Sequence, residues 1–287
     1  MSISSVFKRA PSVAATGLPR GCHNGDVPDP RQGVFETLLV LDGRPVELDA
    51  HLARLEASLA ELFPDRAIPA LGGVTAPEPD CVMRIDVVPR GDRLETEISF
   101  REIRQRPELT ALHSLSVPGG LGAHKWRDRS LLDRAQARLG GLPLVVDIDG
   151  SVLEAARANV FAIHDGALFT PPLDGRILPG VTRARVIELA KSAAIPVHER
   201  PLRRNDLLRA DEVLLSGSVR GIERVDSLDG VTLAKKVDER PDRNQRETGE
   251  VDDQARRSRH ESRVAALRGT SGRGRIAQRH SASSGPR

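Results

Sequence analysis

The stretch from residue 168 to residue 186, "LFTPPLDGRILPGVTRARV", limits most strongly what this chain can fold into. Proline has a fixed φ and no backbone N–H, so Pro171 and Pro172 end the strand-like run before them. Pro179-Gly180 then delays any helix until Val181. A strand, a loop and a helix must follow one another here. Such a loop either merely joins two elements or directs the unpaired N–H groups of the helix start at an anion.

Strand and helix patterns precede this loop. The run "GVFETLLVLDGRPVEL" predicts two strands joined at Asp42-Gly43, a favoured hairpin turn. Asp49 is then expected to cap a helix, on which apolar residues recur at spacings of three and four: Leu52, Leu55, Leu59 and Leu62. Two further strands are predicted at "CVMRIDVVP" and "RLETEISFRE". Together these patterns predict a small α+β domain over residues 31–117.

A second, larger domain is predicted over residues 118–236, after the glycine-rich linker "VPGGLGAH". It should contain a helix near residues 127–138 and a helix at "TRARVIELAKSAA", directly after the loop. Strands are predicted at "PLVVDID", "NVFAIHDG", "VHERPL" and "DEVLLSGS". The predicted fold class is therefore α/β (α+β), with a larger domain that is richer in strands than in helices.

The two ends of the chain differ from this body. Residues 1–30 are expected to be a loose N-terminal segment, and residues 237–287 an Arg-rich, disordered tail that is too poor in apolar residues to fold. The tail accounts for the isoelectric point near 9.2, and a solvated appendage is favoured over a nucleic-acid contact. No apolar run approaches the roughly 20 residues that a membrane span needs, and no secretory signal is seen, so a cytoplasmic protein is expected.

The chain has two cysteines, Cys22 and Cys81, which are too few for a disulfide framework or a thiolate zinc site, so no metal is predicted. Lys125 lies in "AHKWRDR" beside the only tryptophan, in a body that uses Arg heavily and Lys seldom. It is either a solvated surface lysine or a nucleophile for a carbonyl group, since lysine loses its proton readily when desolvated. Glu154 is either an exposed loop carboxylate or an acid that pairs with the protonated ring nitrogen of a cofactor.

Three further positions are compatible with a phosphate site, each weakly by itself. Thr182 offers a hydroxyl at a helix start, and Ser218 lies in the Ser/Gly loop of "LLSGS". Arg54, on the first predicted helix, is either a solvated charge or a bidentate partner of a phosphate.

Taken in order, the segments "VFETLLV", "HLARLEASL", "HKWRDR", "LEAARANVF", "TPPLDGRILPGVTR" and "ADEVLLSGSVRGI" resemble the class IV aminotransferase family, the fold-type IV enzymes that depend on pyridoxal 5'-phosphate (PLP). The family includes branched-chain and D-amino-acid aminotransferases and 4-amino-4-deoxychorismate lyase. The resemblance covers about residues 33–230. It implies a two-domain fold like that of D-amino-acid aminotransferase, PLP as the cofactor, a small-molecule substrate and a homodimer.

The resemblance also implies roles for individual residues. Lys125 matches the Schiff-base lysine, Glu154 the acid that faces the pyridine nitrogen, and Leu178 an apolar residue packed against the ring. Four positions match the binding site of the cofactor phosphate: Arg54, Val181, Thr182 and Ser218. The loop before Val181 is then an anion cradle.

The motifs resemble the lyase most closely. The start "RQGVFETLLVLDGRPVELDAHLARLEASL" lacks the lead-in common in transaminases of the family, and "HKWRDR" and "SVRGI" are similar to lyase domains fused to aminodeoxychorismate synthase. The expected reaction releases pyruvate and gives 4-aminobenzoate, a folate precursor. Arg127, Arg129 and Arg220 are candidates to pair with the two carboxylates of the substrate, or are surface arginines. The alternatives are a branched-chain or D-amino-acid aminotransferase, a non-catalytic PLP-binding protein, and a protein whose tail binds nucleic acid.

Overall fold

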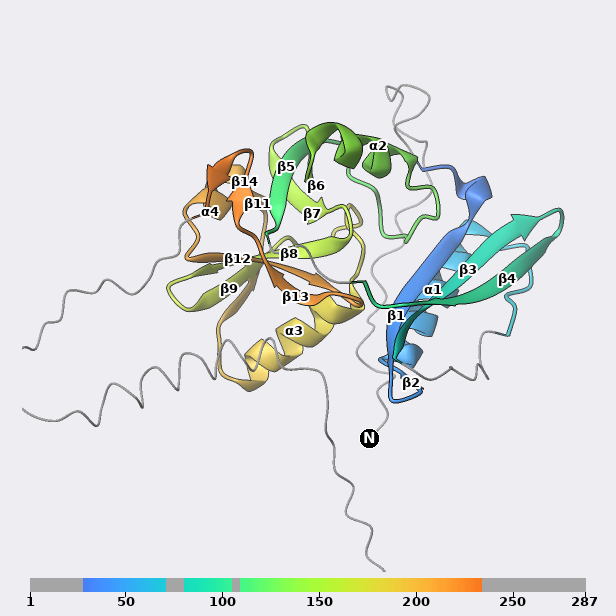
Figure 1. Ribbon diagram of the computed structural model, residues 1–287. Coiled ribbons are helices and arrows are strands. Elements are labelled where there is room, and N and C mark those ends of the chain that lie inside the picture. Colours follow the sequence, from blue (N-terminus) through green and yellow to red (C-terminus); the bar gives the residue numbers. More distant parts are fainter. Residues whose placement is uncertain (1–27, 71–79, 105–108, 234–287) are drawn as a thin grey trace, which may run out of the picture.

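The structure, a computed structural model, describes residues 28–70, 80–104 and 109–233. The predicted Arg-rich tail lies outside these residues, as does most of the predicted N-terminal segment. Figure 1 shows two lobes, each built on its own sheet, with the N-terminal elements in one lobe and the remaining elements in the other. Within the described residues, no helix is long and apolar enough to cross a membrane.

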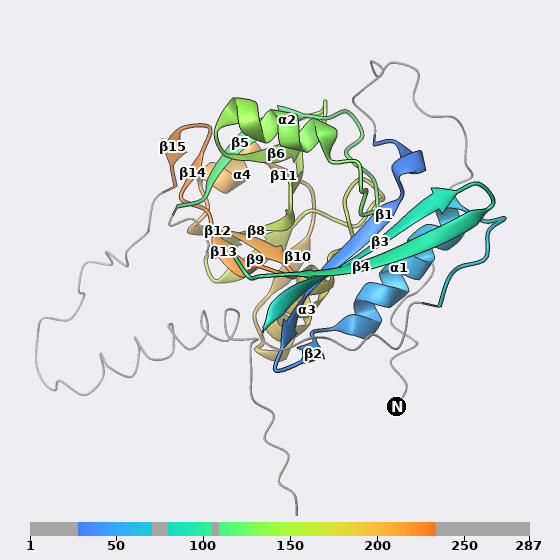
Figure 2. The same cartoon turned by 45° about the vertical axis from the view of Figure 1, so that its right-hand side comes forward.

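The small lobe is an antiparallel sheet in the order β2-β1-β3-β4, covered by helix α1 (Figures 1 and 2). Its elements are β1 (Val34–Leu41), β2 (Arg44–Pro45), α1 (Leu48–Leu62), β3 (Cys81–Arg90) and β4 (Arg93–Arg101). The turn between β1 and β2 has left-handed φ angles at both Asp42 (50°) and Gly43 (70°). This is the geometry that Asp-Gly favours in a two-residue hairpin, so the predicted turn is confirmed.

The apolar face of α1 packs on this sheet. Leu55 and Leu59 are almost fully buried against Leu38, Met83 and Ile85. These residues form the core of the small lobe, and the packing fixes the face of α1 that carries His51 and Arg54 relative to strand β1.

The large lobe holds the second sheet, in which the main path runs β10-β9-β8-β7-β6-β5-β14-β15, while β12 joins β8 and β13. Its strands are β5 (Ala111–Ser116), β6 (Leu142–Val146), β7 (Ser151–Ala155), β8 (Ala158–His164), β9 (Ala167–Thr170), β10 (Val197–Glu199), β11 (Leu202–Arg203), β12 (Glu212–Gly217), β13 (Gly221–Arg224), β14 (Ser227–Leu228) and β15 (Val231–Thr232). Its helices are α2 (Ser130–Leu139), α3 (Val181–Ser192) and the short α4 (Arg204–Leu208).

Helices α2 and α3 lie on opposite sides of this lobe in both views (Figures 1 and 2). Leu132 of α2 packs with Val145 and Leu153, whereas Val186 of α3 packs with Phe161. The strands between the two helices enclose the largest apolar cluster, which includes fully buried leucines at positions 112, 144 and 202. The lobe is thus strand-rich and mixed, as predicted.

Three local expectations need correction. The predicted boundary between residues 117 and 118 falls after β5, yet β5 pairs with β6 and β14 in the large sheet, so the chain changes sheets before Ala111. An alternating strand such as "ALHSLS" does not encode which sheet it joins. Asp49 is not a cap, because α1 begins at Leu48 after Glu47 and has no side-chain cap. Glu154 lies on strand β7, whose five residues are all buried and so lack the alternation that marks a strand.

Candidate active site

A pocket lies where the two lobes meet. Its volume is about 810 Å³ when the open solvent at its mouth is included. It is lined by Arg54 of α1 from the small lobe and by segments of the large lobe. All the positions that we matched to a cofactor site line this one pocket: Arg54, Lys125, Glu154, Leu178, Val181, Thr182 and Ser218. These residues are spread over more than 160 positions of sequence, so the fold brings the predicted set together.

The main chain of Lys125 is held by the first strand of the small lobe. The N–H of Phe35 donates to the carbonyl of Lys125 (2.9 Å), and the N–H of Arg127 donates to the carbonyl of Gly33 (3.0 Å). Trp126 therefore forms an isolated antiparallel bridge with Val34. The segment predicted as a linker returns from the large sheet to this strand and presents Lys125 to the pocket.

The amine of Lys125 is set up to be neutral in part at neutral pH. Burial lowers its pKa from 10.5 to about 8, and the positive charge of Arg54 acts in the same direction, while Glu36 opposes the change. The Nζ atom lies 5.2 Å from the centroid of the Phe35 ring. A neutral amine is the nucleophilic form of lysine, so this environment suits attack on an aldehyde.

Glu154 also lines the pocket and is 7% exposed. Burial raises the pKa of this carboxyl to about 8, against the hydrogen bond from the Leu178 N–H (3.3 Å) and the charge of Lys125. A buried carboxyl of this kind gains a favourable partner when a protonated ring nitrogen lies beside it.

Glu154 and its cross-strand partner Asn159 together hold the loop before α3. Glu154 accepts from the N–H of Leu178, and the Nδ2 of Asn159 donates to the Leu178 carbonyl (2.9 Å). A Cβ on Gly180 would lie 2.0 Å from Oδ1 of Asn159, so any other residue at that position would displace the Asn159 side chain. Leu178 is thereby fixed at both of its backbone polar groups, as a residue that packs against a flat ring requires.

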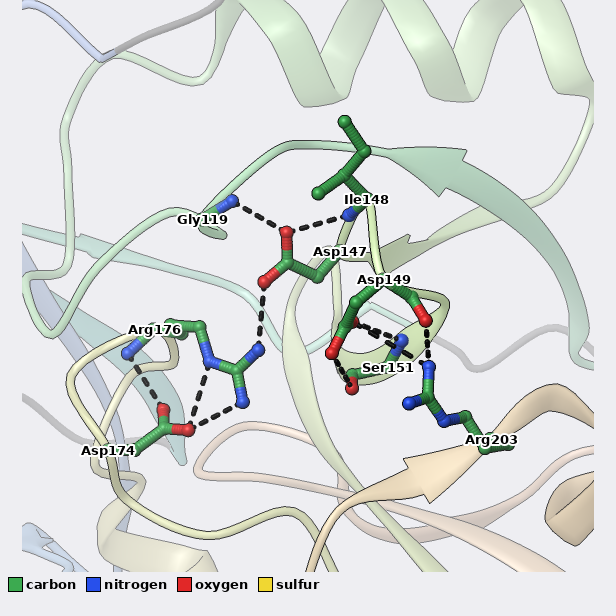
Figure 3. Close-up of polar contacts among 8 residues, drawn as sticks. All are labelled: Gly119, Asp147, Ile148, Asp149, Ser151, Asp174, Arg176 and Arg203. Carbon is green, nitrogen blue, oxygen red and sulfur yellow. Dashed lines mark hydrogen bonds and ion pairs between the residues drawn. The ribbon is translucent and has the colours of Figure 1, made fainter. Parts of the chain in front are cut away.

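The outer side of the same loop is held by Arg176 (Figure 3). Its guanidinium binds Asp174 (2.6 Å) and Asp147 (2.8 Å), and Asp147 also accepts from the N–H of Gly119 (2.9 Å). The Arg176 carbonyl accepts from the N–H of Gly122. Arg176 thus ties the loop to the segment that leads to Lys125.

The start of α3 offers an anion site. Its N-cap residue, Gly180, provides no side-chain cap, and the first main-chain bond of this helix turn runs from Ala184 to Gly180. The hydroxyls of Thr182 and Ser218 lie 3.3 Å apart beside it. Ser216 Oγ is buried in the pocket wall and has no hydrogen-bond partner among the described residues. Unsatisfied N–H groups and hydroxyls around one pocket are the donor set that a phosphate group accepts from.

Arg54 completes this donor set. Its Nε and Nη2 donate to Glu36 (2.8 and 2.6 Å), and its Nη1 donates to the carbonyl of Pro179 (2.9 Å). A guanidinium has five N–H groups, so two remain for a ligand. Amine, carboxyl and anion cradle therefore match the aldehyde, ring nitrogen and phosphate of PLP, and the residues present fit this cofactor.

Of the three arginines that we considered for substrate binding, only Arg129 lines the pocket. Arg129 lines the pocket, and no carboxylate lies within ion-pair distance of it among the described residues; it contacts the carbonyl of Ala156. Burial lowers its pKa, and the nearby charge of Arg157 adds to this effect. Arg127 pairs with Asp86 (3.0 Å) and Arg220 with Glu223 (2.9 Å), and neither is among the residues that line the pocket.

Sequence reasoning missed four residues of this site: Glu36, Asn159, Arg157 and Ser216. Asn159 lies in the motif "LEAARANVF" with Glu154, and Ser216 lies in "SGS" with Ser218. This proximity in sequence to predicted site residues could have identified both. Glu36, in "VFETLLV", gave no such signal, because its partner Arg54 is 18 residues away on another element.

Comparison with known proteins agrees with this geometry. Residues 98–228 match the model of the amino-transferase class IV family. A branched-chain-amino-acid aminotransferase of Salmonella typhimurium is 42% identical over 108 residues, which are 37% of this chain and 35% of that protein. The chain thus spans about a third of the length of the curated relative.

Two solved structures are also similar. The 4-amino-4-deoxychorismate lyase of Pseudomonas aeruginosa is 27% identical with a TM-score of 0.57, over 70% of this chain and 85% of that chain. A hypothetical aminotransferase of Mycobacterium tuberculosis in its PLP-bound form is 26% identical with a TM-score of 0.59, over 71% and 84%. Residues 98–228 thus match the class IV aminotransferase family, and the described fold has the fold-type IV architecture, with similar solved structures that include a PLP-bound form.

Proposed function

We propose that this enzyme is a 4-amino-4-deoxychorismate lyase, which releases pyruvate and leaves 4-aminobenzoate. The proposal depends above all on Arg129, a partly buried cation that lines the same pocket as Lys125 and Glu154 and has no carboxylate within ion-pair distance among the described residues. A buried charge is costly unless it is paired, so this pocket favours a ligand that brings its own carboxylate.

The residues of the pocket divide the work. Arg54, Val181, Thr182 and Ser218 would hold the phosphate, and Leu178 would pack on the ring. When bound, PLP supplies an electron sink that makes a proton on the neighbouring substrate carbon removable. Lys125, with a pKa of about 8, accepts this proton in its neutral form, and Glu154 keeps a proton at the ring nitrogen. Arg129 orients the substrate through its carboxylate.

The number of carboxylates distinguishes the candidate substrates. A branched-chain amino acid brings a single carboxylate, which can pair with Arg129, and an aliphatic side chain that offers no acceptor to any other donor of the pocket. Aminodeoxychorismate carries two carboxylates, so it can satisfy Arg129 while the second carboxylate meets other donors. Arg157 also lines the pocket, and its positive charge favours a substrate with more than one carboxylate.

A branched-chain aminotransferase is the second candidate. It is favoured by the 42% identity with the Salmonella enzyme, although that match covers 37% of this chain. A D-amino-acid aminotransferase is the further alternative that the family resemblance implies, and it is tested in the same experiment.

The test uses purified full-length protein with added PLP. One reaction contains enzymatically generated aminodeoxychorismate and is analysed for 4-aminobenzoate and pyruvate. A parallel reaction contains branched-chain or D-amino acids with 2-oxoglutarate and is analysed for glutamate. Product in the first reaction supports the lyase; product only in the second overturns the choice of reaction and leaves the cofactor assignment in place.

The proposal includes a cytoplasmic homodimer. Its support is the resemblance to the family alone, and sedimentation of the purified protein at micromolar concentration tests the subunit number. A monomer with full activity would contradict this part of the proposal.

A further inference from the structure

Glu36 is a buried carboxylate at the centre of three elements. It lies on β1 and is 1% exposed, and its two oxygens accept from Nε and Nη2 of Arg54 in a parallel, two-point contact. The Nδ1 atom of His51, which is also 1% exposed, lies 2.8 Å from Oε2 of Glu36. His51 and Arg54 are three residues apart on α1, so the same face of the helix presents both side chains to the strand.

The Glu36 carboxylate is ionised in this position. Burial opposes ionisation, but the hydrogen bond from His51 and the charge of Arg54 lower the pKa of Glu36 to about 2. The contact is therefore between full charges, and two-point contacts of this kind fix the plane of the guanidinium as well as its position.

The third contact of Arg54 shows where the guanidinium is aimed. Its Nη1 donates to the carbonyl of Pro179, at the end of the loop that precedes the first turn of α3. The two N–H groups that remain are one on Nη1 and one on Nη2. Arg54 lines the pocket, whereas Glu36 and His51 are not among its lining residues.

We propose that Glu36 and His51 are positioning residues, which hold the guanidinium of Arg54 so that its two remaining N–H groups face an organic phosphate at the start of α3. This inference rests on the proposed function, because it takes the phosphate to be that of PLP. Glu36 acts only through Arg54 and has no contact with the ligand.

An ion pair that only stabilises the small lobe is the alternative. A buried ion pair contributes little net stability compared with apolar residues of the same size, so stability alone is a weak reason for this arrangement. The chain offers a matched control. Asp86, on the neighbouring strand β3, is 6% exposed and binds Arg84 by the same two-point contact (2.6 and 2.6 Å), and Asp86 is not among the residues that line the pocket.

The experiment compares two ligands that differ only in the phosphate. PLP and pyridoxal are titrated into the full-length apoprotein, and binding is followed by the fluorescence of Trp126, the only tryptophan of the chain and part of the pocket wall. In Glu36→Gln, the Kd of PLP should rise about tenfold or more, since a charge-assisted contact is lost. The Kd of pyridoxal should change less than about twofold. His51→Gln should change both constants in the same sense, by a smaller factor.

Thermal unfolding of each apoprotein first establishes that it is folded, and His51→Gln serves as the test variant if Glu36→Gln does not fold. Equal weakening of PLP and pyridoxal, or an equal loss of PLP affinity in Asp86→Asn, overturns the inference in favour of a structural ion pair.

Arg54→Ala separates this inference from the proposal on which it rests. If Arg54→Ala removes the preference for PLP over pyridoxal but Glu36→Gln and His51→Gln do not weaken it, the positioning role is refuted and the phosphate role of Arg54 stands. If Arg54→Ala leaves the preference unchanged, the phosphate role itself is refuted, and the inference with it. Neither result depends on turnover of aminodeoxychorismate, which tests the lyase separately.

Discussion

Glu154 and Asn159 are cross-strand partners on β7 and β8, and between them they bond both backbone polar groups of Leu178. Directly paired residues on antiparallel strands project from the same face of a sheet, which explains how two side chains reach one loop residue. The acid matched to the ring nitrogen and the loop matched to the ring face are therefore set by a single strand pair.

Asn159→Ala should loosen this arrangement without removing a charge. The Leu178 carbonyl loses its donor, which costs about 1 to 2 kcal/mol, and the Kd of PLP should rise by about tenfold. Equilibrium titration of the apoprotein with PLP measures the effect. An unchanged Kd would show that the loop keeps its position without Asn159.

The buried carboxyl of Glu154 predicts a pH dependence of stability in the absence of PLP. Its pKa is about 8 in the folded protein and that of a free glutamate is 4.5, so folding takes up a proton between these pH values. The free energy of unfolding should therefore fall as the pH rises from about 4.5 to about 8. Glu154→Gln should abolish this fall. At pH 8 its free energy of unfolding should exceed that of the unsubstituted protein by on the order of a few kcal/mol.

Urea unfolding of the two apoproteins at a series of pH values measures this difference. Glu56, an exposed residue of α1, supplies the control, because Glu56→Gln should leave the profile of the unsubstituted protein unchanged. Parallel profiles for Glu154→Gln and the unsubstituted protein would contradict the assignment of Glu154 as a protonated, buried carboxyl.

Gly33 should be essential to the strand that holds Lys125. It has a φ of 82°, and a Cβ at this position would lie 2.0 Å from the carbonyl oxygen of Val87. Gly33→Ala should lower the free energy of unfolding by more than about 2 kcal/mol and weaken PLP binding, since both strain and a clash are introduced. Gly91→Ala is the matched control: its φ is 57° but the space around it is open, so about 1 kcal/mol is expected. Equal losses of unfolding free energy in Gly33→Ala and Gly91→Ala would show that the clash with Val87 does not contribute.

Arg129→Met should lower kcat/KM for aminodeoxychorismate by about 10²-fold, mainly through KM, because a charge-assisted contact to the substrate is lost. Arg127→Met removes the same charge two residues away, where the side chain pairs with Asp86 outside the pocket lining, and should stay within about threefold. Steady-state assays of 4-aminobenzoate release make the comparison. Similar values for the two variants would refute the role of Arg129 in substrate binding.

Much of the fold is predictable from the sequence because local rules decide it. Asp42-Gly43 dictates its turn, and the spacing of Leu55 and Leu59 dictates the buried face of α1. Strand β7 was not predicted because all of its residues are buried, so apolar and polar residues do not alternate along it. Strand β5 was assigned to the small domain because the local sequence does not encode the partner of a strand.

The same distinction holds for the site. Lys125 and Glu154 lie in motifs that a family resemblance can match, and both line the pocket. Glu36 contacts Arg54 between β1 and α1, and Arg129 lines the pocket whereas Arg127, two residues earlier, pairs with Asp86 of β3. Only the assembled structure provides this information.

The amine of Lys125 is the group on which the account of the active site depends. Protein saturated with PLP is treated with borohydride, digested, and mapped by mass spectrometry, with Lys191 of α3, an exposed lysine, as the internal reference. A pyridoxyl phosphate group on the peptide that contains Lys125, and none on the reference peptide, is the predicted result. Full occupancy of PLP with no modification at Lys125 would contradict the assignment of this pocket as the site of catalysis.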